Sequence, residues 1–206
     1  MYWALGAAAL AALIDWVSVH REDDRTEAIA KAAVMVLLIA AVVASCDRSL
    51  AMVLIGVALL FSLLGDVLLL PRFDNFLGGL AAFLLGHIFY ALGFLRLGVD
   101  PAGAIAGAAV ALLGILVAGR RIVAGATLQD DNLGKAVVAY TLVISAMVTL
   151  GVGVGPIVAI GATLFVASDA VLGWNRFVAP LPHGRLLIHT LYHLGQGLIV
   201  LGVLTG

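Results

Sequence analysis

A run of 21 residues in the first half of the chain is almost free of charge: residues 50–70 are LAMVLIGVALLFSLLGDVLLL, and only Asp66 is ionisable. A helix of this length is about 31 Å long, which is enough to cross the roughly 30 Å hydrocarbon core of a bilayer. Backbone polar groups cannot stay unpaired in lipid, so such a segment must be helical. We therefore predict that residues 50–70 form a membrane-spanning helix.

The rest of the 206-residue chain has the same character. Apolar residues make up 64% of it and charged residues 11%, whereas a soluble domain carries about 25% charged residues. The pattern predicts an all-α fold, a polytopic membrane helical bundle in one domain (1–206). The first apolar run starts at Met1 without a basic segment, which favours a span over a cleaved signal peptide. Eight spans are predicted near residues 2–19, 29–46, 50–70, 75–96, 102–118, 134–151, 156–174 and 185–204.

Lysine and arginine are distributed unequally between the two predicted sides. Only Arg48 and Arg96 lie on the side that holds the termini. Cytoplasmic loops are enriched in Lys and Arg, so both termini are expected outside the cytoplasm. The protein is expected in a bacterial cell membrane. The nine residues on the other side, in or beside the loops after the odd-numbered spans, are Arg21, Arg25, Lys31, Arg72, Arg120, Arg121, Lys135, Arg176 and Arg185. No basic stripe with interleaved aromatics exists, so a nucleic-acid partner is not expected.

The two halves of the chain, 1–100 and 101–206, share a pattern of polar residues. A lysine precedes an aspartate by 35 residues in the first half and 34 in the second, and a His-x-x-Tyr motif begins 21 or 20 residues later. Four spans separate the copies, so both would cross the membrane in the same direction, as in parallel repeats. The matched positions are Lys31, Asp66, His87 and Tyr90, and Lys135, Asp169, His189 and Tyr192.

The ionisable residues inside these spans are costly in a bilayer and are therefore candidates for function. Asp66 and Asp169 lie at similar depth near the predicted cytoplasmic side, and Arg185, His189, Tyr192, His193 and Gln196 share one helical face. These residues predict a cavity that opens toward the cytoplasm. Asp15 has no counterpart in the second half and is expected to be structural.

Two carboxyl groups in a cavity of low dielectric suit acid–base chemistry, because one can carry a proton while the other stays ionised. Lys31, Arg176 and Arg185 could hold a phosphate headgroup at the rim. The residues alone point only weakly to a membrane-embedded lipid hydrolase.

Four segments resemble the YhhN family of lysoplasmalogenase-like membrane proteins. They are residues 61–69 (FSLLGDVLL), 78–90 (GGLAAFLLGHIFY), 161–169 (GATLFVASD) and 190–196 (TLYHLGQ). The likeness extends over most of the chain. It departs from the family pattern at Ala32, where proline usually follows the lysine, and at His193, where a second tyrosine is common.

The resemblance implies hydrolysis of the vinyl-ether bond of a lysoplasmalogen-like lysophospholipid, without a metal or other cofactor, to a fatty aldehyde and a glycerophospho-alcohol. Asp66 and Asp169 would be the catalytic acid and its partner, in an order that the sequence does not reveal. The oligomeric state is equally open. Residues expected to bind or orient the substrate are Lys31, His87, Tyr90, Ser168, Asn175, Arg176, His189, Tyr192 and Gln196.

Two other functions fit parts of the pattern. His189 and His193, one helical turn apart, could join His87 and an aspartate in a zinc site of a lipid hydrolase. Membrane carboxylates in parallel repeats also suit a proton-coupled transporter or a small-molecule binding protein, although no proline interrupts the spans that carry the aspartates.

Overall fold

The computed structural model describes all 206 residues, and every regular element in it is helical. Eight helical units are long and apolar enough to cross a membrane, and one of them comprises α5, η1 and α6 together. The predicted fold class is therefore confirmed. The helices are α1 (Tyr2–His20), α2 (Asp24–Ala44), α3 (Leu50–Leu68), α4 (Phe76–Leu97), α5 (Pro101–Gly114), the π-helical η1 (Ile115–Gly119), α6 (Arg120–Gln129), α7 (Asp131–Val154), α8 (Pro156–Phe177) and α9 (Gly184–Thr205).

The second span begins at Asp24, five residues before the predicted start. The reason is an N-cap: the Asp23 carboxylate accepts a hydrogen bond from the Thr26 backbone N–H at 3.1 Å and another from the Thr26 hydroxyl at 2.6 Å. Such a cap satisfies an amide that the helix itself cannot pair. The first turn of α2 is consequently polar, and hydropathy alone places the start too late.

The predicted loop between residues 118 and 134 is wrong. Arg120 and Arg121 lie in α6, which continues α5 and η1 without a break, and α7 begins only two residues after α6 ends. Hydropathy marks the lipid-embedded part of a helix and not its polar extension. This extension is stabilised by a small apolar cluster, in which Ile122 and Ala126 of α6 pack with Val137 and Phe177.

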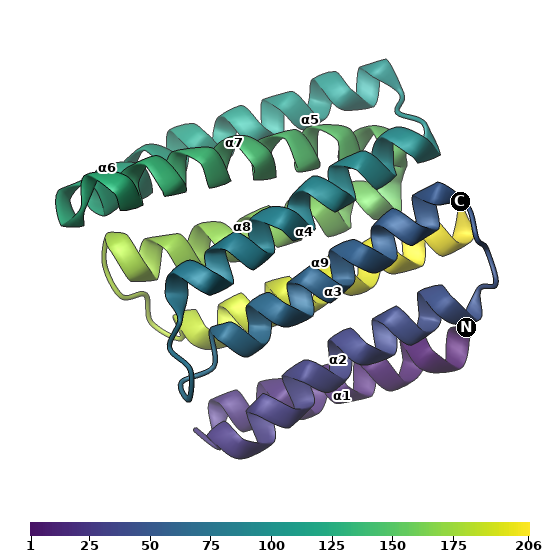
Figure 1. Ribbon diagram of the computed structural model, residues 1–206, viewed down its shortest axis with the longest axis horizontal. Helices are drawn as coiled ribbons and strands as arrows, with labels where there is room; N and C mark the ends of the chain where they lie inside the picture. Colours follow the sequence, from purple (N-terminus) through teal and green to yellow (C-terminus); the bar gives the residue numbers. More distant parts are fainter.

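The helices pack mainly as sequential pairs (Figure 1). The α1–α2 pair forms one edge of the bundle and the α5–α7 pair the other, with α3, α4, α8 and α9 between them. Contacts between α4 and α7 and between α1 and α9 connect the two halves of the chain. The loops that follow α1, α3, α6 and α8 lie at one end of the bundle, and both termini lie at the other end.

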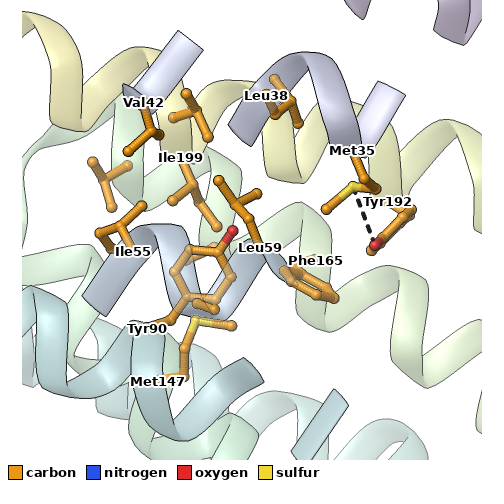
Figure 2. Close-up of a cluster of buried hydrophobic side chains, with 14 of the residues drawn as sticks. Met35, Leu38, Val42, Ile55, Leu59, Tyr90, Met147, Phe165, Tyr192 and Ile199 are labelled. Atoms are coloured by element: carbon orange, nitrogen blue, oxygen red, sulfur yellow. Dashed lines mark hydrogen bonds between the residues drawn. The ribbon is translucent and has the colours of Figure 1, made fainter. Parts of the chain in front are cut away.

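The centre of the bundle is a core to which both halves contribute. Figure 2 shows Met35 of α2, Leu59 of α3, Tyr90 of α4 and Phe165 of α8 meeting in this core. All four side chains are buried. The site described below lies next to this core and is therefore built on packed helices rather than on loops.

The two helices α8 and α9 approach unusually closely. A Cβ atom on Gly161 would lie 2.7 Å from the Ile199 backbone nitrogen, and one on Gly195 would lie 2.9 Å from the Phe165 nitrogen. Small residues allow this contact in membrane bundles, where helices are held by van der Waals packing. The contact fixes Asp169 on α8 relative to Tyr192 on α9.

Candidate active site

Asp66 is a buried carboxylate on α3 that is held by residues of two other helices. Its Oδ1 lies 3.1 Å from the Lys31 Nζ of α2, and its Oδ2 accepts a hydrogen bond of 2.8 Å from the Tyr192 hydroxyl of α9. Both side chains of the ion pair are largely buried, with exposed fractions of 11% and 3%. A buried charge must be paired, and the ammonium group of Lys31 is the counter-charge that lies beside Asp66.

Asp169 on α8 has different neighbours. Its Oδ2 accepts a hydrogen bond from the Tyr140 hydroxyl of α7, and the Nε2 of His87 on α4 lies 3.6 Å away. No lysine or arginine forms an ion pair with it. The two candidate catalytic carboxyl groups therefore sit in environments of different charge.

The hydrogen bonding of His87 indicates which of its two ring nitrogens carries a hydrogen. Its Nδ1 lies 2.6 Å from the Phe83 carbonyl oxygen, which can only accept, so Nδ1 carries a hydrogen. In neutral imidazole Nε2 is then an acceptor, and it has no hydrogen-bond partner. The contact between His87 Nε2 and Asp169 Oδ2 joins two acceptors, and it is favourable only when one of them carries a proton. The pair of Asp169 and His87 is therefore suited to hold one proton.

Both carboxyl groups line one polar cavity of about 340 Å³ between α2, α3, α4, α8 and α9. Eight of the eleven residues predicted for the site contribute to its wall. The residues that line this polar cavity are Glu27, Lys31, Asp66, Leu69, Leu70, Pro71, Asp74, Phe76, Phe83, Ser168, Asp169, Leu172, Asn175, Arg176, Arg185, Ile188, His189 and Tyr192.

An apolar groove meets this polar cavity. It runs between α4, α5, η1, α6, α7 and α8, and its wall includes Ala111, Gly114, Ile144 and Val166. Five residues belong to both spaces, and Asp169 is the only one of them with a polar side chain; the others are Leu69, Phe76, Phe83 and Leu172. Asp169 thus marks the junction of a polar space and an apolar space.

Three predicted residues do not line the polar cavity. His87 lies behind Asp169 as described, whereas Tyr90 and Gln196 lie within the core. The Tyr90 hydroxyl donates to Oε1 of Gln196, a contact between the two halves of the chain. Neither of these two residues contacts a candidate catalytic aspartate.

Two of the lining residues have structural partners for their polar atoms. The Ser168 hydroxyl donates to the Ile188 carbonyl at 3.0 Å, and Oδ1 of Asn175 accepts from the Leu181 backbone N–H at 2.8 Å. The first bond ties α8 to α9 and the second shapes the loop between them.

His189 does not contact either candidate catalytic aspartate. Its Nδ1 lies 2.7 Å from Oδ2 of Asp15, and its Nε2 lies 3.6 Å from Oε1 of Glu27. Glu27 also pairs with Arg185 at 2.6 Å, and Asp24 pairs with the same guanidinium at 2.8 Å. Arg185, expected to bind phosphate, is already neutralised by two carboxylates.

Arg176 is the cation at the rim that remains unpaired. It forms no ion pair, and its guanidinium carbon lies 4.9 Å from the centre of the Phe76 ring. Lys135, the counterpart of Lys31 in the predicted repeat, is exposed and outside the polar cavity, so it does not pair with Asp169. In the first half Lys31 pairs with Asp66. The aspartates and the His-x-x-Tyr motifs meet crosswise: Asp66 contacts Tyr192, and Asp169 faces His87.

Two residues of the site were not predicted from the sequence. Tyr140 is the only tyrosine of its span, and a phenol deep in an apolar span needs a partner, which was an available signal. Glu27 precedes Lys31 by one helical turn and shares its face. The three histidines of the alternative zinc site do not lie together. His87 faces Asp169, whereas His189 and His193 face Asp15. No group of three potential ligands forms.

A family model, the YhhN family, matches residues 26–203 of the chain. The chain belongs to the YhhN family. Every residue that lines the polar cavity lies within the matched residues.

Characterised proteins named lysoplasmalogenase are similar to this YhhN chain. Lysoplasmalogenase TMEM86B of Sus scrofa is 36% identical over 148 residues, which cover 71% of this chain and 61% of that protein. The Homo sapiens TMEM86B is 35% identical over 71% of this chain and 62% of its own length, and Homo sapiens TMEM86A is 29% identical over 71% and 63%. The chain thus spans about three fifths of these relatives. No solved structure matches it. With its eight apolar helices, the chain is an integral multi-pass membrane protein.

Proposed function

We propose that this YhhN chain is a membrane-embedded hydrolase that cleaves the vinyl-ether bond of a lysoplasmalogen-like lipid. The observation that carries the proposal is the position of Asp169, where the polar cavity meets the apolar groove. A lysoplasmalogen has its vinyl ether at the corresponding place, between a polar glycerophosphate head and a hydrocarbon chain. The similarity to proteins named lysoplasmalogenase supports the same reaction.

The substrate would lie with its chain in the apolar groove and its head in the polar cavity. Arg176 is the cation free to bind the phosphate, because Arg185 is occupied by Asp24 and Glu27. Charge-assisted hydrogen bonds from a guanidinium to phosphate are among the stronger polar contacts available. This orientation brings the enol-ether carbons to Asp169.

The chemistry assigns different roles to the two carboxyl groups. Asp169 protonates the β-carbon of the vinyl ether, which gives an oxocarbenium ion at the carbon bonded to oxygen. Asp66, held as a carboxylate by Lys31, stabilises this cation electrostatically. Water adds to the cation and its proton returns to Asp169. The resulting hemiacetal breaks its bond to the glycerol oxygen, which leaves as an alcohol, and the aldehyde is released.

The surrounding residues support these different roles for Asp169 and Asp66. Tyr140 and His87 hold Asp169 without adding a positive charge, so the carboxyl group can carry the proton that the reaction needs. Lys31 and Tyr192 hold Asp66 in a fixed orientation. These contacts support Asp169 as the acid and Asp66 as the electrostatic partner in the proposed reaction.

The test is aldehyde release by purified protein from a panel of lysolipids, with and without a vinyl ether. Asp66→Asn and Asp169→Asn should each lower turnover by about 10²- to 10⁴-fold, the range expected for loss of an acid–base group or of a fixed transition-state charge. Asp47→Asn, at the opposite end of the bundle, is the matched control and should retain activity. Full turnover by both site variants would refute the proposal.

The same assay separates the enzyme from a transporter. An enzyme should release aldehyde in detergent, where no gradient exists. Protein that turns over no lysolipid in detergent would instead support the transporter interpretation.

A further inference from the structure

His189 and Asp15 form a buried pair that has no role in the reaction described so far. Nδ1 of His189 on α9 lies 2.7 Å from Oδ2 of Asp15 on α1, and the two side chains are 6% and 0% exposed. A carboxylate can only accept a hydrogen bond, so Nδ1 carries a hydrogen, and in neutral imidazole Nε2 is then an acceptor. A carboxylate from another helix thus holds both the tautomer and the orientation of the His189 ring.

The other nitrogen of this ring reaches the polar cavity. His189 lines that cavity together with Asp66 and Asp169. Nε2 of His87 and both ring nitrogens of His193 are enclosed by other atoms without a hydrogen-bond partner. Nε2 of His189 also makes no hydrogen bond within the protein, but it is not enclosed. A molecule in the polar cavity can therefore donate a hydrogen bond to it.

A second carboxylate lies near Nε2 of the same ring. Oε1 of Glu27 on α2 is 3.6 Å from this nitrogen, and the guanidinium of Arg185 lies 2.6 Å from the other oxygen, Oε2, of Glu27. Negative charge therefore faces both ring nitrogens of His189, from Asp15 on one side and from Glu27 on the other. An imidazolium that forms for a moment during a reaction would be stabilised by both.

One proton transfer of the proposed reaction has no residue assigned to it. When the hemiacetal breaks, its hydroxyl loses a proton and the glycerol oxygen gains one. Asp169 has by then regained its proton and cannot accept another. The two oxygens of Asp66 are already held by Lys31 and Tyr192. A neutral imidazole can accept this proton and, once protonated, donate it, which makes histidine suited to both parts of the step.

We propose that His189 is a third catalytic residue, which takes the proton of the hemiacetal hydroxyl and gives it to the glycerol oxygen. This inference rests on the proposed function. The electron pair of the O–H bond forms the carbonyl of the aldehyde, and the pair of the broken C–O bond stays with the glycerol oxygen. The imidazolium protonates that oxygen and returns to neutral imidazole. Asp15 is a positioning residue that acts on the substrate only through His189.

A single-turnover experiment, with purified full-length protein in excess over a lysoplasmalogen, separates the two parts of the reaction. The remaining vinyl ether is measured by mass spectrometry after an alkaline quench, in which vinyl ethers are stable. The aldehyde is followed through its oxidation by NAD⁺ and an excess of added aldehyde dehydrogenase. In the unchanged protein, vinyl ether should disappear and aldehyde should appear at the same rate.

The variant that tests the role is His189→Gln, because the glutamine amide can still donate to Asp15 but cannot carry the proton. Vinyl ether should disappear at nearly the usual rate, since Asp169 is unchanged. Aldehyde should appear about 10²-fold more slowly, as expected for the loss of an acid–base group. Asp169→Asn should instead slow the loss of vinyl ether itself. His20→Gln, at an exposed histidine at the end of α1, is the matched control and should behave like the unchanged protein.

The role of Asp15 has its own test. Asp15→Asn should slow the appearance of aldehyde and not the loss of vinyl ether, because an amide no longer selects the tautomer with an acceptor at Nε2. The double variant with His189→Gln should release aldehyde no more slowly than His189→Gln alone, since a residue that acts only through His189 has no effect once His189 is replaced. A further loss in the double variant would overturn the role of Asp15.

The inference is overturned if His189→Gln slows both signals together or neither of them while the unchanged protein turns over, and the proposed function then stands. If the unchanged protein consumes no vinyl ether, the proposed function fails and the inference fails with it. If His189→Gln does not yield folded protein by size-exclusion chromatography, the same two signals in Asp15→Asn decide.

Discussion

Asp66 and Asp169 are the same residue type at the same depth of the bundle, yet their contacts give them different properties. Asp66 has an ammonium group at 3.1 Å and a phenol at 2.8 Å. Asp169 has a phenol and a histidine nitrogen that is itself an acceptor. In the proposed reaction Asp66 acts as a carboxylate with the ammonium group of Lys31 as its counter-ion. A carboxyl group without a cation can keep its proton for the reaction.

Removing the Tyr140 hydroxyl tests how Asp169 is positioned. Tyr140→Phe should lower kcat about tenfold and leave KM almost unchanged, because the lost hydrogen bond orients the acid and does not bind the substrate. Kinetics on a lysoplasmalogen measure both constants. The matched control is Tyr2→Phe, which removes the hydroxyl of an exposed tyrosine on α1. An increase in KM with unchanged kcat would assign Tyr140 to substrate binding instead.

The two aspartates could be predicted from the sequence because an ionisable residue in an apolar run stands out. Their partners could not all be predicted in this way. Lys31 was found through its spacing to Asp66, but Tyr140 and Glu27 come from helices whose adjacency the sequence does not state. His189 was expected to orient a catalytic aspartate and instead pairs with Asp15. Asp15 was expected to be structural, and its contacts with two histidines agree with a role in holding α9.

At the scale of helices, the apolar groove depends on an irregularity in one span. The π-helical η1 joins α5 to α6, and Ile115 and Gly119 at its two ends line the groove. Single π-helical turns inside α-helices are rare, but those that occur are often found at functional sites. Gly114, directly before η1, also lines the groove and leaves the space beside it open, since its nearest neighbour would be Val166 Cγ1 at 4.0 Å from a Cβ.

Filling this space should change the chain length that the protein accepts. Gly114→Phe is expected to lower kcat/KM for a sixteen-carbon vinyl ether about tenfold, because displacing two methylenes from an apolar wall costs about 1.6 kcal/mol. Activity toward an eight-carbon chain should change less than twofold. Gly6→Phe, at an exposed glycine of α1 outside the groove, serves as the control. Equal losses for both chain lengths would show that the groove does not hold the chain.

The helices themselves were largely predictable, and their ends were less so. Eight spans follow from hydropathy, because only helices can satisfy the backbone in lipid. The polar start of α2 and the whole of α6 lie outside the apolar runs and were predicted as loops. What fixes these ends is capping by Asp23 and the packing of Ile122 and Ala126, and neither feature changes the hydropathy of a span.

For the whole molecule, the distribution of charge predicts the orientation in the membrane. The loops after α1, α3, α6 and α8 lie at one end of the bundle (Figure 1). Seven of the nine lysines and arginines assigned to that side lie in these loops or in the adjoining helix ends, and Arg120 and Arg121 lie at the start of α6. Positively charged residues favour the cytoplasmic side, so the polar cavity should open toward the cytoplasm. The repeat of two halves remains a prediction, supported by the crosswise contacts of Asp66 with Tyr192 and of Asp169 with His87.

The single cysteine provides a probe of this orientation. Cys46 is exposed between α2 and α3, at the end of the bundle that holds the termini. A membrane-impermeant maleimide should label it in intact cells. A Cys46→Ala, Asp74→Cys variant carries its thiol in the loop between α3 and α4 and should be labelled only after permeabilisation. The reverse pattern would invert the predicted topology.

The central claim is that Asp169 delivers a proton to carbon at the junction of the polar cavity and the apolar groove. Hydrolysis of a lysoplasmalogen by the purified protein in D₂O, followed by immediate reduction and mass spectrometry of the released aldehyde, measures this step directly. We predict one deuterium on the carbon next to the aldehyde carbon, in aldehyde that Asp169→Asn forms far more slowly than the unchanged protein. Aldehyde without deuterium at that carbon, or deuterated aldehyde formed equally fast by Asp169→Asn, would contradict it.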